Sequence, residues 1–136
     1  MREIKFRAWD KINDCMFDVA TLTWLVGGLK IEDPATISEF QGENCILMQF
    51  TGLLDKNGVE IYEGDVVRFD ETDITPPELA HKAKGVGEVY YCVDFTLEMN
   101  PCFALWIKGS GHKHLGIANE VIGNIYSNPE LLEEGV

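Results

Sequence analysis

Basic residues are scarce in this sequence. Lysine and arginine together number 11, against 23 aspartates and glutamates, so the formal net charge is −12 with histidine neutral. Proteins that bind the phosphate backbone of nucleic acids generally take their affinity from clustered Lys and Arg. The charge balance therefore argues against a general backbone binder, although it is compatible with a local basic patch. We interpret the acidic surface mainly as a source of solubility, and secondarily as a surface that docks a basic partner or imitates a nucleic acid.

Patterns for metal binding and for membrane insertion are also missing. The four cysteines are Cys15, Cys45, Cys92 and Cys102; none lies in a CxxC pair or near a histidine at zinc-ligand spacing. No apolar run approaches the roughly 20 residues that span a bilayer, and the N-terminal residues lack the apolar segment of a signal peptide. We therefore expect a cytoplasmic protein whose thiols are reduced and mostly buried as small hydrophobic side chains.

The first third of the chain carries β patterns. Ile4–Trp9 alternates with period two, and Cys15–Val19 can return beside it as the second strand of a hairpin. Thr21–Val26 is rich in β-branched and aromatic residues, which favours a strand. The segment 33–42 is predicted to be a loop, after which Cys45–Phe50 resumes as a core strand.

The strongest turn signal lies within Thr51–Phe69. A tight hairpin turn needs positive φ at its centre, and Asn57-Gly58 supplies residues that tolerate it. Apolar runs flank this pair on both sides. Asp65 follows Gly64, where its carboxylate is expected to accept hydrogen bonds from backbone N–H groups in a second turn.

The last part of the chain alternates strands with connections. A variable loop is predicted over 70–86, with one helical turn near its two prolines. Further strands are predicted at Gly87–Phe95, Cys102–Lys108 and Val121–Tyr126, a helical turn at Leu115–Glu120, and a short C-terminal helix.

These elements predict a mainly β fold (β with minor helix). Their order is that of an SH3-like small barrel with an added N-terminal β-hairpin layer. We expect the layer to comprise residues 1–44 and the barrel core residues 45–136, with the variable loop 70–86 and the C-terminal helix attached, all in one compact unit. This fold-level analogy carries no function.

The three histidines are candidate metal ligands. His112 and His114 would share a face if they lay on a strand, but no cysteine or acid stands at useful local spacing, and His81 lies in the predicted loop. We interpret all three as solvated loop histidines. Asp55–Gly58 is similar to part of a calcium loop, yet aligning the glycines leaves apolar or glycine residues in the first and last ligand positions. The hairpin turn is the better interpretation.

Catalytic patterns are equally weak. A carboxylate pair would need one member with a raised pKa, and nothing in the sequence indicates burial of the candidates Glu60, Glu63, Asp65 and Asp70. No serine lies in a nucleophile motif, as the sequence around Ser38, Ser110 and Ser127 shows. Core packing is the default interpretation of the large aromatics, which are Trp9, Trp24, Tyr90, Tyr91, Phe103 and Trp106. We therefore assign no catalytic, cofactor-binding or metal-binding residues.

Three blocks of sequence together resemble the YopX family of phage and prophage proteins. They are Arg2–Lys11, Met48–Val67 and Val121–Leu132. The resemblance runs from the first predicted strand to the last segment, whereas the stretch between Phe69 and Gly87 shows no recognisable pattern. It implies a phage setting and a bacterial host cytoplasm. The family has no assigned activity that we could transfer, so no catalytic residue follows from it.

The leading functional hypothesis is a non-enzymatic phage or prophage accessory protein that binds protein, including itself. We expect a homo-oligomer, a host or phage protein as a further partner, and no membrane partner. The alternative is a nucleic-acid-binding small-barrel module, which predicts that Lys82, Lys84, Lys108 and Lys113 gather on one face. A weaker alternative is an enzyme that acts on a small metabolite, which would need a concave pocket with converging polar groups.

Overall fold

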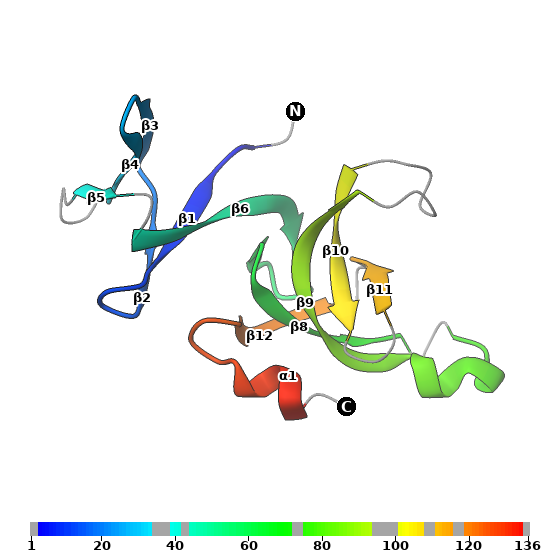
Figure 1. The fold of residues 1–136 in the computed structure, drawn as a ribbon. Coiled ribbons are helices and arrows are strands. Elements are labelled where there is room, and N and C mark those ends of the chain that lie inside the picture. The colour runs from blue at the N-terminus through cyan, green and yellow to red at the C-terminus, as the bar shows by residue number, and fades with distance from the viewer. Residues whose placement is uncertain are drawn as a thin grey trace. The chain divides into compact units, whose positions relative to one another are not determined.

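The computed structural model describes residues 3–33, 39–41, 44–71, 75–93, 101–107, 111–115 and 119–134. The chain divides into two compact units, Met1–Phe50 and Thr51–Val136, which are described separately below. Antiparallel β strands dominate both units, and helix is limited to short segments (Figure 1). The prediction of a mainly β fold is therefore confirmed. No helix among the described residues is long and apolar enough to cross a membrane.

The first unit is built around β1 (Phe6–Asp10), which lies between β2 (Cys15–Asp18) and the first part of β6 (Cys45–Leu54). The predicted hairpin of the first two strands is confirmed. Its turn is held by the Asp10 carboxylate, which accepts hydrogen bonds from the Ile12 N–H at 2.9 Å and the Asn13 side-chain amide at 2.7 Å. The Asn13 amide outweighs the effect of burial and lowers the pKa of Asp10.

A three-stranded sheet completes the first unit. Its order is β3 (Thr21–Leu25), β4 (Gly28–Glu32) and β5 (Glu39–Gln41), so that β3 and β5 are the edges. The core consists of Ala8, Ile31 and Cys45, against which partly buried apolar side chains pack. The loop predicted over 33–42 is wrong at its end, because residues 39–41 pair with β4.

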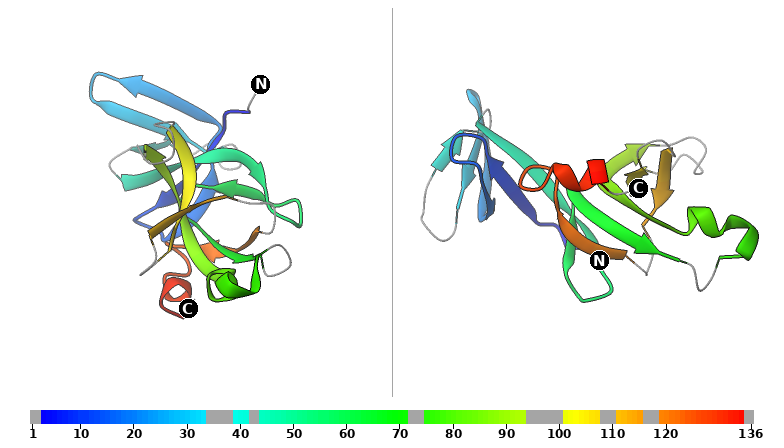
Figure 2. Two further views of the ribbon diagram at one scale, coloured as in Figure 1. Left: turned by 90° about the vertical axis from the view of Figure 1, so that its right-hand side faces the viewer. Right: turned by 90° about the horizontal axis from the view of Figure 1, so that it is seen from below.

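The strand β6 continues into the second unit from Thr51 on, and the described residues form six further strands after it. The strand β7 (Glu60–Tyr62) pairs with β6, and a five-stranded sheet has the order β11-β10-β9-β8-β12. Figure 2 shows how strongly this sheet curls. The members of the sheet are β8 (Asp65–Asp70), β9 (Lys84–Val93), β10 (Pro101–Ile107), β11 (Gly111–His114) and β12 (Asn119–Asn124).

One apolar cluster fills the concave side of this sheet. Its buried members are Ile61, Val67, Phe69, Val89, Phe103 and Leu105. They come from β7, β8, β9 and β10, so burying them ties the sheet to the β6–β7 hairpin. A curled antiparallel sheet around one core is consistent with a small β barrel. The finer SH3-like name for that barrel stays a prediction.

Several predicted connections turn out to be strands. The segment β9 begins at Lys84, so the last residues of the predicted loop 70–86 pair with β8. His112 and His114 lie in β11, not in a loop. The helical turn predicted at Leu115–Glu120 is wrong for Asn119 and Glu120, which belong to β12, and residues 116–118 lie outside the described residues. The short helices η2 (Pro77–Lys82) and α1 (Glu130–Glu134) occur where helical turns were predicted.

Gly87 lets two strands of the core approach closely. A Cβ at this position would lie 3.0 Å from the Trp106 carbonyl oxygen and 3.2 Å from the Leu105 Cβ. Backbone and buried side-chain atoms of β10 cannot move aside cheaply, because Leu105 is fully buried.

We expect Gly87→Ala to lower the free energy of unfolding by about 1–3 kcal/mol, as overpacking of a filled core does. Urea unfolding followed by circular dichroism measures this change. The matched control is Gly27→Ala, since a Cβ at Gly27 meets no atom within 4 Å and should leave stability unchanged or slightly higher. Equal unfolding midpoints for both variants would contradict the close approach.

Candidate functional site

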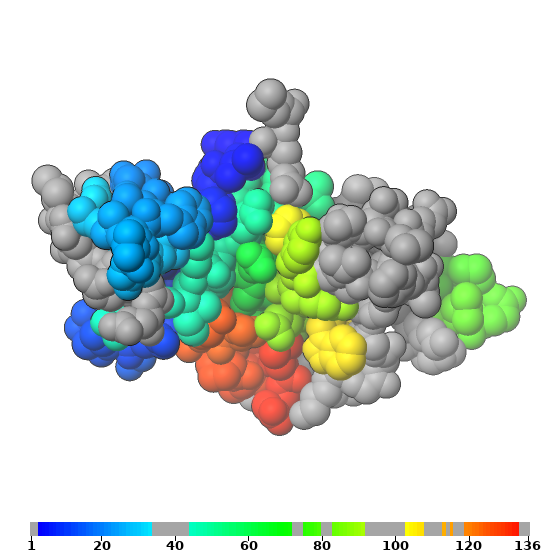
Figure 3. Space-filling view, turned by 45° about the horizontal axis from the view of Figure 1, so that its top comes forward, coloured from blue at the N-terminus to red at the C-terminus, as the bar shows by residue number. Residues whose placement is uncertain are grey.

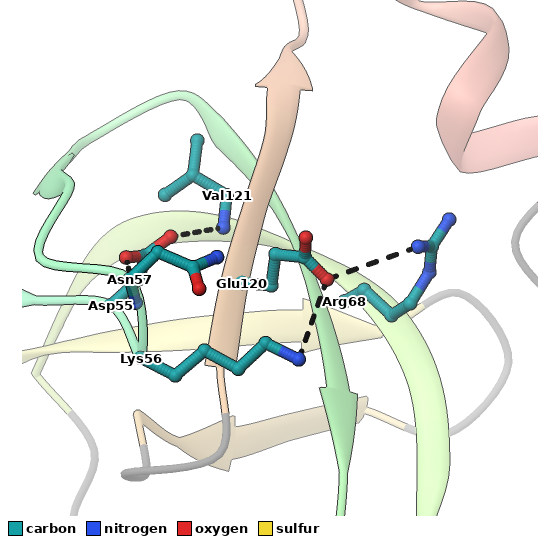
Figure 4. A network of polar contacts seen from close by, with 6 residues as sticks. All are labelled: Asp55, Lys56, Asn57, Arg68, Glu120 and Val121. Atoms are coloured by element: carbon teal, nitrogen blue, oxygen red, sulfur yellow. Dashed lines mark hydrogen bonds and ion pairs between the residues drawn. The ribbon is translucent and has the colours of Figure 1, made fainter.

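The buried carboxylate of Asp55 organises one end of the second unit (Figure 4). One carboxylate oxygen, Oδ1, accepts hydrogen bonds from the Asn57 N–H at 2.8 Å and the Val59 N–H at 2.9 Å. The other, Oδ2, accepts one from the Val121 N–H at 2.9 Å. The first two bonds close the β6–β7 turn, and the third attaches that turn to β12. Gly58, with φ of +83°, completes the turn as the sequence predicted.

These contacts decide the charge of Asp55. Burial alone would raise its pKa, but the hydrogen bonds from Val121, Val59 and Asn57 together outweigh burial, so the pKa lies below its ordinary value. A carboxylate with three protein donors is occupied by the fold itself. The turn interpretation of Asp55–Gly58 is therefore confirmed, and Asp55 is a structural residue.

A row of exposed ion pairs lies beside Asp55 and its turn. The Glu120 carboxylate is 3.7 Å from the Lys56 ammonium and 4.0 Å from the Arg68 guanidinium (Figure 4). Glu120 and Arg68 are opposite each other on β12 and β8. Ion pairs this exposed contribute little to stability, so we interpret the row as charge balance on the surface.

An acid and two aromatic side chains form a different arrangement on β9 and β10. Glu88 is directly opposite Trp106, and Tyr90 is opposite Ala104, so the three large side chains belong to one face of the sheet. The Tyr90 and Trp106 rings meet edge to face, with centroids 6.5 Å apart. We call Glu88, Tyr90 and Trp106 the Glu88–Trp106 patch.

The Glu88–Trp106 patch combines exposure with partial desolvation. Trp106 is 49% exposed, and atoms of β10 (yellow) lie at the surface in Figure 3. Glu88 is half-buried, and this burial raises the pKa of its carboxyl group. A carboxylate that has lost part of its water beside an exposed indole is chemically suited to receive a cation.

Catalysis at this patch would need a second polar group. The described residues directly opposite Glu88 are Trp106 and Val66, and neither titrates. No group of three or more His, Cys, Asp or Glu among the described residues could hold a metal ion.

The histidines and carboxylates weighed in the sequence do not converge. His112 and His114 occupy alternate positions of β11, and His81 lies in η2; the side chains of all three lie outside the described residues. Asp65 is buried, and its carboxylate accepts the Tyr62 N–H at 2.8 Å, which confirms the predicted turn. Asp70 is exposed, whereas Glu60 and Glu63 are partly buried.

The serines and cysteines also lie apart. Ser127 is exposed and donates its backbone N–H to the Asn124 side chain at 2.8 Å, while Ser38 and Ser110 lie outside the described residues. Cys45 is buried, where desolvation raises the pKa of its thiol. Cys15 is exposed, so the expectation of burial is wrong for it. The side chains of the remaining two cysteines are outside the described part of the chain.

Core packing of the aromatics is only partly right. Trp9 and Phe103 are buried, with exposed fractions of 9% and 8%. Trp24, Tyr91 and Trp106 are between about half and three-quarters exposed, so the interpretation is wrong for these three. Tyr91 still contacts the Phe103 ring at 5.3 Å between centroids. Trp24 lies next to Leu25 and Val26 at the end of the β3–β4 hairpin, where all three are exposed.

The lysines predicted to form a basic face are engaged with acids where the structure describes them. The Lys113 ammonium is 2.6 Å from the Glu71 carboxylate and lies over the Phe69 ring. The Lys84 ammonium is 4.0 Å from Asp70. The side chains of Lys82 and Lys108 lie outside the described residues.

Sequence reasoning missed three polar residues. The sequence places Asp55 in the hairpin turn but does not assign its carboxylate a role, although a position two residues before Asn57-Gly58 is typical of an aspartate that accepts backbone N–H groups. Glu88 is the only acid among residues 84–93 and is followed directly by apolar and aromatic residues, a signal that could have drawn attention to it. Asn119 is fully buried, and neither polar atom of its side chain has a hydrogen-bond partner in the described structure; no sequence pattern points to this.

Comparison with known proteins finds similarity over nearly the whole chain. The family model described as YopX protein matches residues 5–133. A crystal structure of protein EF1440 from Enterococcus faecalis is similar at 27% sequence identity and a TM-score of 0.57, covering 97% of this chain and 99% of that chain. A comparison with curated proteins found no match.

We expect Asp55→Ala to lower the free energy of unfolding by about 2–4 kcal/mol, since three N–H groups lose their acceptor. Asp55→Asn should cost less, because its amide oxygen can still accept two of the three donors. Urea unfolding at neutral pH measures both changes. Asp18→Asn, at an exposed position, is the control and should leave stability unchanged.

The low pKa of Asp55 also predicts an acid limb of stability. Its folded pKa is below the unfolded value of about 3.9, so its contribution is complete above that value and is lost as pH falls through the folded pKa. Asp55→Asn should flatten this limb in urea titrations between about pH 5 and pH 2. An unchanged slope in that variant would contradict the assignment.

Proposed function

The chain belongs to the YopX family, and we propose that it is a non-enzymatic module that binds another protein through the Glu88–Trp106 patch. The phage or prophage setting and the cytoplasmic location expected from the sequence remain part of this proposal. The observation that supports it most is the pairing of a partly desolvated carboxylate with a half-exposed indole on one sheet face.

The chemistry of the patch selects the partner. A guanidinium can stack on an indole and also pair with a carboxylate, because it is planar and weakly hydrated. Such a group would offset the desolvation of Glu88, since a nearby positive charge favours the ionised form. We infer that the partner presents an arginine, and that the acidic net charge of −12 speeds the approach of a basic surface.

The other two hypotheses have less support. A nucleic-acid module would use free cations, whereas the four described Lys and Arg side chains of the second unit lie within 4.0 Å of acids. An enzyme would use at least two converging titratable groups. Glu88 has only apolar or aromatic neighbours directly opposite it.

A peptide of alternating arginine and serine tests the proposal. The three tryptophans of the chain give separate indole N–H signals in NMR spectra, which Trp→Phe variants assign. We expect the arginine peptide to shift the Trp106 signal, and the same peptide with neutral citrulline in place of arginine to leave it unmoved. Glu88→Gln should weaken binding roughly tenfold, as expected for the loss of a charge-assisted contact.

The matched control is Glu130→Gln, which removes one exposed acid from α1 in the same unit and should leave binding unchanged. Binding should also weaken as pH falls through the raised pKa of Glu88, because protonation removes the charge. Equal shifts with the arginine and citrulline peptides, or no shift of the Trp106 signal, would refute the proposed function.

A further inference from the structure

The strand β3 presents an open edge. Within the described residues it occupies the end of the order β3-β4-β5, and all five of its residues pair with β4 on one side. Hydrogen-bonded and non-hydrogen-bonded pairs alternate along an antiparallel strand. Alternate residues of β3 therefore direct their N–H and C=O groups away from β4, where another strand could bind them.

This edge lacks the devices that usually prevent pairing. Soluble proteins protect edge strands with charges, proline or bulges. The stretch Val19–Leu29 contains no charged residue and no proline, and the register of β3 with β4 is continuous. Trp24 is 74% exposed and Leu25 is 57% exposed, so apolar surface accompanies the open backbone. Atoms of this hairpin (light blue) form part of the surface in Figure 3.

We propose that β3 pairs antiparallel with β3 of a second copy of this chain, joining two three-stranded sheets into one of six strands. Centred on Thr23, the pairing places Thr23 opposite its own symmetry mate and Leu22 opposite Trp24. Both pairs are of kinds that stabilise antiparallel sheets. An isologous contact of this type closes as a dimer.

Charge favours a second copy over other occupants. Two chains of net charge −12 repel in general, but strands free of charge over Val19–Leu29 approach without bringing acids together. A basic protein would find no acid in β3 to pair with. The first unit has eight acidic and five basic residues, so an anionic membrane would be repelled by it. The ammonium of Lys30, one of those basic residues, is already 3.1 Å from the Glu32 carboxylate.

This inference goes beyond the proposed function and uses none of the residues of the Glu88–Trp106 patch. Loss of dimerisation would therefore leave arginine-peptide binding intact, and failure of peptide binding would leave the dimer intact. The two proposals can fail separately.

Sedimentation velocity over a concentration series tests the pairing, and Thr23→Glu is the deciding variant. Thr23 is opposite Lys30 in β4, so a glutamate there supports the hairpin while two glutamates face each other across the dimer axis. We expect the wild type to dimerise and Thr23→Glu to raise the dissociation constant at least tenfold. Ile12→Glu carries the same added charge at an exposed turn and should still dimerise.

Cross-linking checks the register. In the Cys15→Ser background, Thr23→Cys should form a disulfide-linked dimer with a mild oxidant, because directly opposite Cα atoms lie within disulfide range. Ala20→Cys should not, since its symmetry mate would lie about 20 Å away along the strands. Circular dichroism confirms that each variant is folded. A monomeric wild type, a dimeric Thr23→Glu variant, or equal cross-linking of both cysteine variants would overturn the proposal.

Discussion

The second unit depends on the buried carboxylate of Asp55. Asp55 gives up water on folding, and three backbone N–H groups replace that water. One of these donors, Val121, is 66 residues away in sequence, so the carboxylate joins the β6–β7 turn to the last strand of the sheet. The Lys56 N–H adds a hydrogen bond to the Asn119 carbonyl at 2.9 Å in the same place. A neutral residue in place of Asp55 would satisfy fewer donors, which explains why an acid stands before this turn.

The five-stranded sheet of the second unit has one face that packs into the apolar core and another that carries partly exposed polar and aromatic side chains. On one face, Val67, Phe69 and Leu105 are buried in a single apolar cluster, and Gly87 lets β9 and β10 approach closely. On the other face, Glu88 and Trp106 are only partly covered. Because side chains alternate along a strand, an acid in the sequence GEVYY avoids the core while remaining beside aromatic rings. Rigid backbone positions of this kind hold a binding group more firmly than a loop would.

The first unit has a different kind of surface, which depends on the backbone. Among the described residues no strand pairs with the outer edge of β3, and Trp24 and Leu25 on that strand are exposed. A strand edge recognises another strand through main-chain hydrogen bonds, so its selectivity comes from register and from the absence of clashing charges. The Glu88–Trp106 patch would select a partner by charge and ring stacking instead. Two surfaces with such different chemistry suit two different partners.

The sequence by itself determined the elements whose signals are local. Alternating residues marked β1 and β10, Asn57-Gly58 marked the central turn, and the motif blocks indicated the family. Only the tertiary structure decided that Glu39–Gln41 and Gly111–His114 form strands, because neighbouring strands supply their hydrogen bonds and their own residues carry little apolar pattern. It also decided which aromatics are exposed and that Glu88 is partly desolvated. Burial depends on which distant segments cover a side chain, and no local pattern encodes that.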